Sequence, residues 1–299
     1  MRRLLLPVLL LALALPLAAQ QTAPEFVIGV DFVQPKPDCP IFIRHVNPGS
    51  PAEKSGVRPG DQLLSIDGQA FTNLADMQKL TADKPKPVRM EVTRPDGKHF
   101  FDLTRERFVD ALARQGRKLV PGPMVVPADM TDAEIQRMVN FDPNRVTGLV
   151  FTTGYPEDPA LYYGGFQVLL VSGKSLNGAG DLAGAAAAQQ ADELLVGGME
   201  DGPATHAGVH SGDAVLSVNG KDTKGLTPDQ LAKLFSSATP GKMTLRVRRL
   251  DQERTFEFPL WKTSDVLKVN QLQMVQGHLV PLNVPEKYYS CFVAEGAAQ

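Results

Sequence analysis

Residues 47–68 read NPGSPAEKSGVRPGDQLLSIDG, and residues 199–220 read MEDGPATHAGVHSGDAVLSVNG. When Pro51 is aligned with Pro203, Ala, Gly, Val, Gly, Asp, Leu, Ser and Gly recur in the same order without a gap. Agreement at one fixed offset indicates an internal repeat. The copies start roughly 150 residues apart, which is about the length of a domain, so the repeat predicts two domains rather than a solenoid.

Each copy predicts a short helix that is followed by a turn and a strand. In the first copy Ser50 is the expected N-cap, Pro51 the first helical residue, Glu53 the capping partner and Gly56 the stop. Asp61 is the expected acceptor of the turn, as Asp213 is in the second copy. The stretch QLLSIDG then alternates like a strand and breaks at Asp-Gly.

The flanks of the two copies also agree. An apolar segment precedes each copy, EFVIGVDFV at 25–33 and YYGGFQVLLV at 162–171. A helical pattern and then a pair of alternating strands follow each copy, starting at 71–80 and 226–235. These patterns predict an α+β fold.

The stretch at 49–68 resembles the core of a bacterial PDZ domain, as found in HtrA-type proteases and C-terminal processing peptidases, and the stretch at 201–220 resembles it almost as closely. The resemblance implies two small, partly open β-barrels or sandwiches, each with two helices, joined by a helical linker. The expected segments are PDZ-like domains at 25–105 and 149–262, a Gly/Ala-rich insertion in the second at 172–192, a linker at 106–148 with a proline-rich spacer at 120–127, and a tail at 263–299.

In PDZ domains an extended peptide adds as a strand between a sheet edge and a helix, and its terminal carboxylate lies on N–H groups of a glycine-containing loop. In the first unit the resemblance implies peptide-binding residues Val27, Ile28, Gly29, Val30, Leu74, Met77 and Leu80. In the second unit it implies Gly164, Gly165, Phe166, Leu231 and Phe235. The alternative is that these are ordinary core residues. The insertion at 172–192 could also close the second groove.

The first residues predict export. Arg2 and Arg3 precede an apolar run, Leu4 to Leu17, and AAQ follows it, as in a secretory signal peptide cleaved after Ala19. The run is short for a membrane anchor. We therefore expect a periplasmic or secreted protein with no stable membrane span after cleavage. A formal net charge of −2 gives no reason to expect nucleic acid as a partner.

The chain has two cysteines, Cys39 and Cys291. An exported chain with an even cysteine count permits a disulfide. The sequence leaves a disulfide and two separate buried thiols both open.

No catalytic signature stands out. Ser50 and Lys54 lie one helical turn apart, but Ser50 is explained as a helix cap. His206 and His210 have the spacing of a zinc pair but lack a third ligand. No G-x-S-x-G elbow, P-loop or dinucleotide fingerprint occurs. Outside the signal and the two units no block above roughly 45 residues remains, too little for a protease domain. We therefore expect no enzyme, no cofactor and no metal.

The favoured hypothesis is a module that binds extended or C-terminal peptide segments of other exported proteins. An accessory subunit that docks on a separate periplasmic peptidase is the alternative. A hydrolase with an unrecognised site is the third hypothesis.

Overall fold

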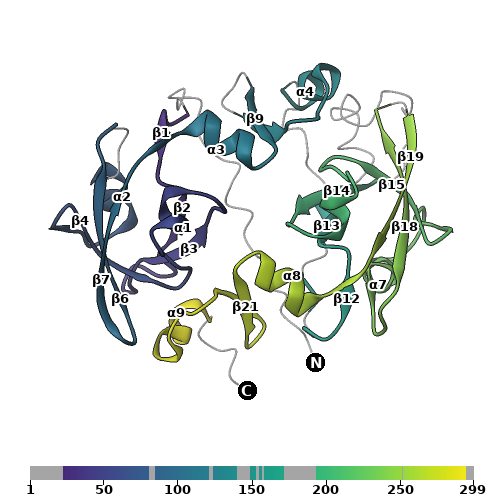
Figure 1. Ribbon diagram of the computed structural model, residues 1–299. Helices are drawn as coiled ribbons and strands as arrows, with labels where there is room; N and C mark the ends of the chain where they lie inside the picture. The colour runs from purple at the N-terminus through teal and green to yellow at the C-terminus, as the bar shows by residue number, and fades with distance from the viewer. Residues whose placement is uncertain are drawn as a thin grey trace.

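The computed structural model describes residues 23–80, 85–120, 124–139, 149–152, 155–156, 158–171, 193–250 and 252–293. Two sheet-rich units lie on either side of the molecule, and segments of the linker and tail lie between them at the two ends (Figure 1). The expected signal peptide at 1–19 and insertion at 172–192 lie outside the described residues.

The first unit is an antiparallel sheet with two helices. Its strands lie in the order β2 (Val30–Val33), β3 (Phe42–Val46), β4 (Gln62–Ile66), β6 (Val88–Arg94) and β7 (Gly97–Leu103), with β5 (Gln69–Ala70) on β4. The helices are α1 (Pro51–Lys54) and α2 (Leu74–Leu80). Helix α1 begins where Ser50 Oγ accepts a hydrogen bond from the Glu53 amide at 3.2 Å, as the sequence predicts.

The second unit repeats this order. Its strands are β13 (Phe166–Val171), β14 (Glu193–Met199), β15 (Ala214–Val218), β18 (Lys242–Arg249) and β19 (Gln252–Pro259), with β16 (Lys221–Asp222) on β15. Its helices are α6 (Pro203–His206) and α7 (Pro228–Leu234), and Thr227 starts α7 with a capping box. The repeated sheet-and-helix units confirm the predicted α+β class.

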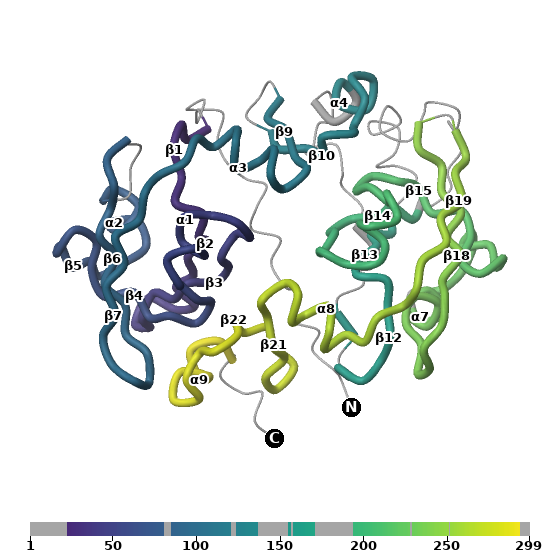
Figure 2. Tube along the Cα trace, in the orientation of Figure 1, coloured from purple at the N-terminus to yellow at the C-terminus, as the bar shows by residue number. Residues whose placement is uncertain are grey.

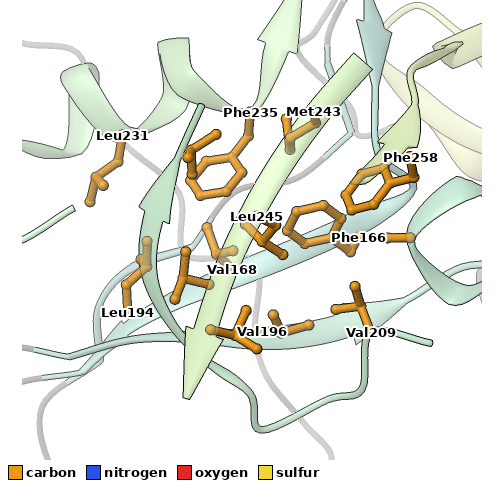
Figure 3. Close-up of a cluster of buried hydrophobic side chains, with 14 of the residues drawn as sticks. Phe166, Val168, Leu194, Val196, Val209, Leu231, Phe235, Met243, Leu245 and Phe258 are labelled. Atoms are coloured by element: carbon orange, nitrogen blue, oxygen red, sulfur yellow. The ribbon is translucent and has the colours of Figure 1, made fainter. Parts of the chain in front are cut away.

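Each unit has its own apolar core. Figure 3 shows the core of the second unit, where Phe166 meets Phe235 and Phe258 edge to face, with ring centroids 5.6 and 6.2 Å apart. In the first unit Ile43, Ile66 and Met90 are completely buried. Burial of each such side chain contributes about 1.5–3 kcal/mol, so each unit has enough core to hold its sheet and helices together.

The repeat extends beyond the PDZ-like units. Paired elements of the linker and the tail follow them: β8 (Glu106–Arg107) and β20 (Trp261–Lys262), α3 (Phe108–Arg114) and α8 (Thr263–Val269), then the hairpins β9 (Arg117–Val120) with β10 (Met124–Pro127) and β21 (Leu272–Val275) with β22 (His278–Pro281). The prediction of a spacer at 120–127 is wrong in part, because Met124–Pro127 is a strand that pairs with β9. The described part of the linker ends with α4 (Asp132–Val139), and that of the tail contains η2 (Glu286–Tyr288) and α9 (Tyr289–Phe292).

Each extension follows one unit along the chain and contacts the other unit, as the trace in Figure 2 shows. The end of the linker contacts the second unit: Glu134 Oε1 lies 3.8 Å from Arg249 Nε, and Asp129 Oδ2 lies 3.5 Å from His210 Nε2. The tail packs on the first unit instead, where Asn283 Nδ2 donates to the Pro59 carbonyl at 3.1 Å. Each extension therefore fastens its own repeat to the other one.

A disulfide joins Cys39 of the first unit to Cys291 of the tail. The sequence left this pairing open. Beside the bond, Phe42 is completely buried against Val280 and Val284 of the tail. The tail is thus held to the first unit both covalently and by an apolar cluster.

None of the helices in the described part of the chain has the length and apolar character that crossing a bilayer requires.

Candidate functional site

Strand β2 lies at the end of its sheet and has β3 as its neighbour in that sheet. Opposite Val30, the backbone N–H and C=O of Val46 both bond the side-chain amide of Gln271, at 2.7 Å each. Opposite Phe32, the Ile43 amide donates to the Asp61 carbonyl, and the Ile43 carbonyl accepts from the Gly60 amide, just before β4. Facing residues of an antiparallel pair point their backbone groups either toward each other or away from each other. Val30 and Phe32 therefore point their N–H and C=O groups at an edge that no other strand in the described part of the chain pairs, which we call the open edge of β2.

The loop between β1 (Phe26–Val27) and β2 requires glycine. Gly29 has φ +83°, and a Cβ atom there would lie 2.2 Å from Ser50 Cβ. The carbonyl oxygens of Ile28 and Gly29 accept from the amides of Ala52 and Asn47, which holds the loop against α1. Within the described ranges no acceptor is present for the amide N–H groups of Ile28 and Gly29. Such neighbouring free donors can hold a carbonyl or carboxylate oxygen.

A cavity of about 380 Å³ lies beside this loop and strand. It contacts three consecutive strand residues, Val30, Asp31 and Phe32. Successive side chains of a strand point to opposite faces, so a cavity that touches all three runs along the strand edge. Its opposite wall comes from the linker: Phe108, Ala111, Leu112, Gln115 and Val125. The volume is within the range of ligand sites in proteins.

The loop residues expected from the sequence, Val27 to Val30, all line this cavity. The expected helix residues do not: Met77 is 1% exposed in the core, and Leu74 and Leu80 are partly buried against that core. A contact between these three side chains and a peptide stays a prediction.

The sequence analysis missed the wall that α3 forms. A usable signal was present, because Phe108, Ala111, Leu112 and Gln115 have the i, i+3, i+4, i+7 spacing of one helix face. The sequence analysis assigned this helix to the linker and gave it no contact with the groove.

The second unit has the same loop. Gly165 has φ +77°, and the Gly164 carbonyl accepts from the Ala204 amide at 3.0 Å, as the Ile28 carbonyl does from Ala52. The other expected residues, Phe166, Leu231 and Phe235, are buried in the core (Figure 3). Whether they also contact a peptide stays a prediction.

The edge of β13 is already paired. Strand β11 (Leu149–Thr152) lies antiparallel to it, with Leu149 opposite Val171 and Thr152 opposite Leu169. Strand β13 corresponds to β2, so β11 lies where the first unit has an open edge. The sequence analysis considered the insertion at 172–192 as the segment that closes this groove. That insertion lies outside the described residues, and β11 covers the edge.

A partly buried polar cluster lies next to the second loop. The ring of Tyr155 contacts that of Tyr163, with centroids 5.9 Å apart. Burial raises the pKa of Glu200, and the hydrogen bonds from Tyr155 and Gln167 lower it by less than burial raises it. The buried Tyr163 Oη and Glu200 Oε2 have no hydrogen-bond partner among the described residues. This cluster therefore favours a neutral carboxyl at Glu200.

The raised pKa predicts how stability depends on pH. A carboxyl group whose pKa is higher in the folded state contributes stability below its unfolded pKa, and that stability is lost as the pH rises through the folded value. We therefore expect Glu200→Gln to raise the free energy of unfolding relative to the parent protein at pH 7.5 but not at pH 4. Urea unfolding at both values measures this, with the exposed Glu253→Gln as control. An equal effect of Glu200→Gln at both pH values would contradict the prediction.

The residues considered for catalysis have structural partners. Ser50 caps α1, and His206 Nε2 lies 2.7 Å from Asp201 while His210 faces Asp129. Across the described residues no group of three or more His, Cys, Asp or Glu side chains could hold a metal ion.

Comparison with known proteins identifies the repeated unit. The family model for the PDZ domain matches residues 42–94 and 195–249. The magnetosome formation protease MamE of Paramagnetospirillum magneticum is 28% identical over 222 residues, 71% of this chain and 29% of that protein. A putative zinc metalloprotease of Rhizobium meliloti is 40% identical over 107 residues, 36% of this chain and 28% of that protein. The chain thus spans less than a third of the length of these relatives.

Among solved structures, the PDZ domain of HtrA3 bound to a phage-derived ligand aligns with 28% of this chain and 86% of that chain, at 21% identity and a TM-score of 0.26. A PDZ domain protein from Parabacteroides distasonis aligns with 78% of this chain and 97% of that chain, at 8% identity and a TM-score of 0.26. The two segments matched by the family model run from β3 to β6 and from β14 to β18, the same part of each repeat. The chain therefore contains two PDZ domains.

Proposed function

We propose that this chain is an exported, non-catalytic protein that binds extended or C-terminal peptide segments of other exported proteins in the groove of its first PDZ domain. The observation that carries the proposal is the open edge of β2. Its outward N–H and C=O groups at Val30 and Phe32 lie beside the cavity. An unpaired strand edge is a template for another strand. The β13 edge is taken by β11, so the first domain is the proposed binding site.

Two features support export and a non-catalytic role. The first residues are typical of a secretory signal peptide, and disulfides such as Cys39–Cys291 persist in oxidising compartments. The side chains that come closest to a catalytic constellation, Ser50, His206 and His210, serve as a helix cap and in ion pairs.

The edge model predicts that Val30→Pro weakens peptide binding about fivefold to tenfold. Proline removes the outward amide donor, and one lost hydrogen bond of about 1–1.5 kcal/mol corresponds to a factor of that size. The β2–β3 ladder keeps its hydrogen bonds, because the Val30 amide points away from β3. Peptides that the parent protein enriches from a display library would be titrated against the parent and against the Val30→Pro variant. Equal affinities for the two proteins would contradict the edge model.

Two variants on α3 test the cavity without touching β2. Gln115→Trp places a ring at the exposed rim of the cavity and should block binding, whereas Ala113→Trp places it on an exposed site of the same helix outside the lining. Gly29 is unsuitable for this purpose, since any side chain there clashes with Ser50 and would disturb the loop itself.

The alternative role is an accessory subunit that docks on a separate periplasmic peptidase through another surface. It predicts that capture of the peptidase survives both Val30→Pro and Gln115→Trp. Loss of the captured partner in both variants, with Ala113→Trp unaffected, would instead support the groove.

A further inference from the structure

The strand that covers the second groove is not a chain end. From Leu149 to Thr152 its partners run from Val171 to Leu169, so β11 runs toward the loop at Gly164 and Gly165. Three residues after Thr152, the ring of Tyr155 lies against that of Tyr163, which directly precedes the loop. This PDZ fold thus pairs its groove edge with an internal segment that has no terminal carboxylate.

The cavity of the first domain also continues past its loop. It is lined by the edge of β2 on one side of Gly29 and by Phe26 and Pro24 on the other side. A strand advances about 3.3 Å per residue, so a ligand that ended opposite Gly29 would leave the part beside Phe26 unfilled. A longer chain would run on between Phe26 and the wall formed by Phe108 and Val125.

The residues that line the part of the cavity beside Phe26 suit a peptide chain that continues better than one that ends in a carboxylate. Phe26, Phe108 and Val125 are apolar, and burying an ionised carboxylate among apolar groups without a partner costs several kcal/mol. One cation and one anion line the cavity, Arg105 and Asp31, so their charges offset each other. Arg105 Nε already donates to the Lys86 carbonyl at 3.0 Å.

We propose that the groove of the first PDZ domain takes an internal, extended, mainly apolar segment about as long as β11, which has four residues, and that it does not require a free C-terminus. This inference rests on the proposed function and names its ligand class. The ligand strand runs antiparallel to β2, bonds the outward groups of Val30 and Phe32, and continues past Gly29 toward Phe26.

The test is a random ten-residue library shown to the full chain in two formats, at the free C-terminus of a carrier and between two folded carriers. A peptide is taken to bind the groove when its enrichment is lost with the Gln115→Trp variant and kept with the Ala113→Trp variant. We expect enrichment in the internal format. Enrichment in the free C-terminal format alone would overturn this inference and leave the proposed function standing, whereas enrichment in neither format would overturn both.

Matched synthetic peptides then measure the contribution of the carboxylate. Each enriched sequence is made with a free C-terminus, with a C-terminal amide, and with three added residues. We expect the three dissociation constants to agree within about threefold. Hydrogen bonds to a charged group contribute about 1.5–3 kcal/mol, so a tenfold or greater loss on amidation would show that the carboxylate is recognised and would overturn the inference.

Discussion

Replacing Cys39 and Cys291 together with alanine is expected to lower the free energy of unfolding by about 3–5 kcal/mol. The bond closes a loop across 252 positions of the chain. A disulfide restricts the unfolded chain, and the chain-entropy relation gives about 5 kcal/mol for a loop of this length. The folded tail keeps its apolar contacts with Phe42, so the loss falls mainly on the unfolded state.

Urea unfolding followed by circular dichroism measures this effect in the double variant and in the parent protein with and without reductant. The reduced parent should match the double variant, because both lack the same covalent link. Peptide binding by the folded double variant should stay unchanged, since neither cysteine lines the cavity. An unfolding midpoint that neither change shifts would show that the bond contributes nothing beyond the packing of the tail.

The repeated stretch predicted the fold because its residues have local functions. Ser50 caps α1 through the amide three residues later, and Asp61 and Asp213 accept from amides at the turns, as their positions indicated. These interactions span three residues, so they can be read without knowing the fold. The arginines that hold the same aspartates lie 33 and 36 positions away and give no local signal.

The sequence did not reveal that the tail repeats the fold of the linker, because different residues adopt the same backbone conformation in the two segments. Gly116 and Gln271 occupy equivalent positions with φ +65° and +60°, and their carbonyls accept equivalent bonds from Ala128 and Leu282. Identity comparison does not find such pairs. The contacts of Asp129 and Glu134 with the second unit and of Asn283 with the first join distant parts of the chain, which local patterns do not encode.

The difference between the two grooves was also hidden in the sequence. Strand pairing uses backbone groups, which every residue carries. The segment LVFT at 149–152 therefore shows β-forming character but not its partner. The glycine loops could be predicted from the sequence, because glycine alone fits the space and backbone conformation at Gly29.

Arg249→Ala is expected to destabilise the protein by about 3–5 kcal/mol, the usual cost of removing one partner from a buried ion pair. Arg249 bonds Asp213 through two nitrogens, at 2.6 and 2.7 Å, and donates to the Gly208 carbonyl at 2.7 Å. Its loss leaves two buried carboxylates without their cation, Asp213 of the second domain and Glu134 of α4. The variant should therefore weaken both the domain and the docking of the linker on it.

The first domain supplies the matched control. Arg94 makes the same two bonds to Asp61 and one to the Gly56 carbonyl, but its side chain is 12% exposed against 7% for Arg249. Among the described residues Arg94 forms an ion pair with one carboxylate, that of Asp61. Arg94→Ala should therefore cost less than Arg249→Ala. Denaturant unfolding compares them, and hydrogen exchange at α4 should accelerate with Arg249→Ala alone. Equal losses of unfolding free energy in the two variants, with hydrogen exchange at α4 unchanged, would show that the Glu134 contact does not fasten the linker to the second domain.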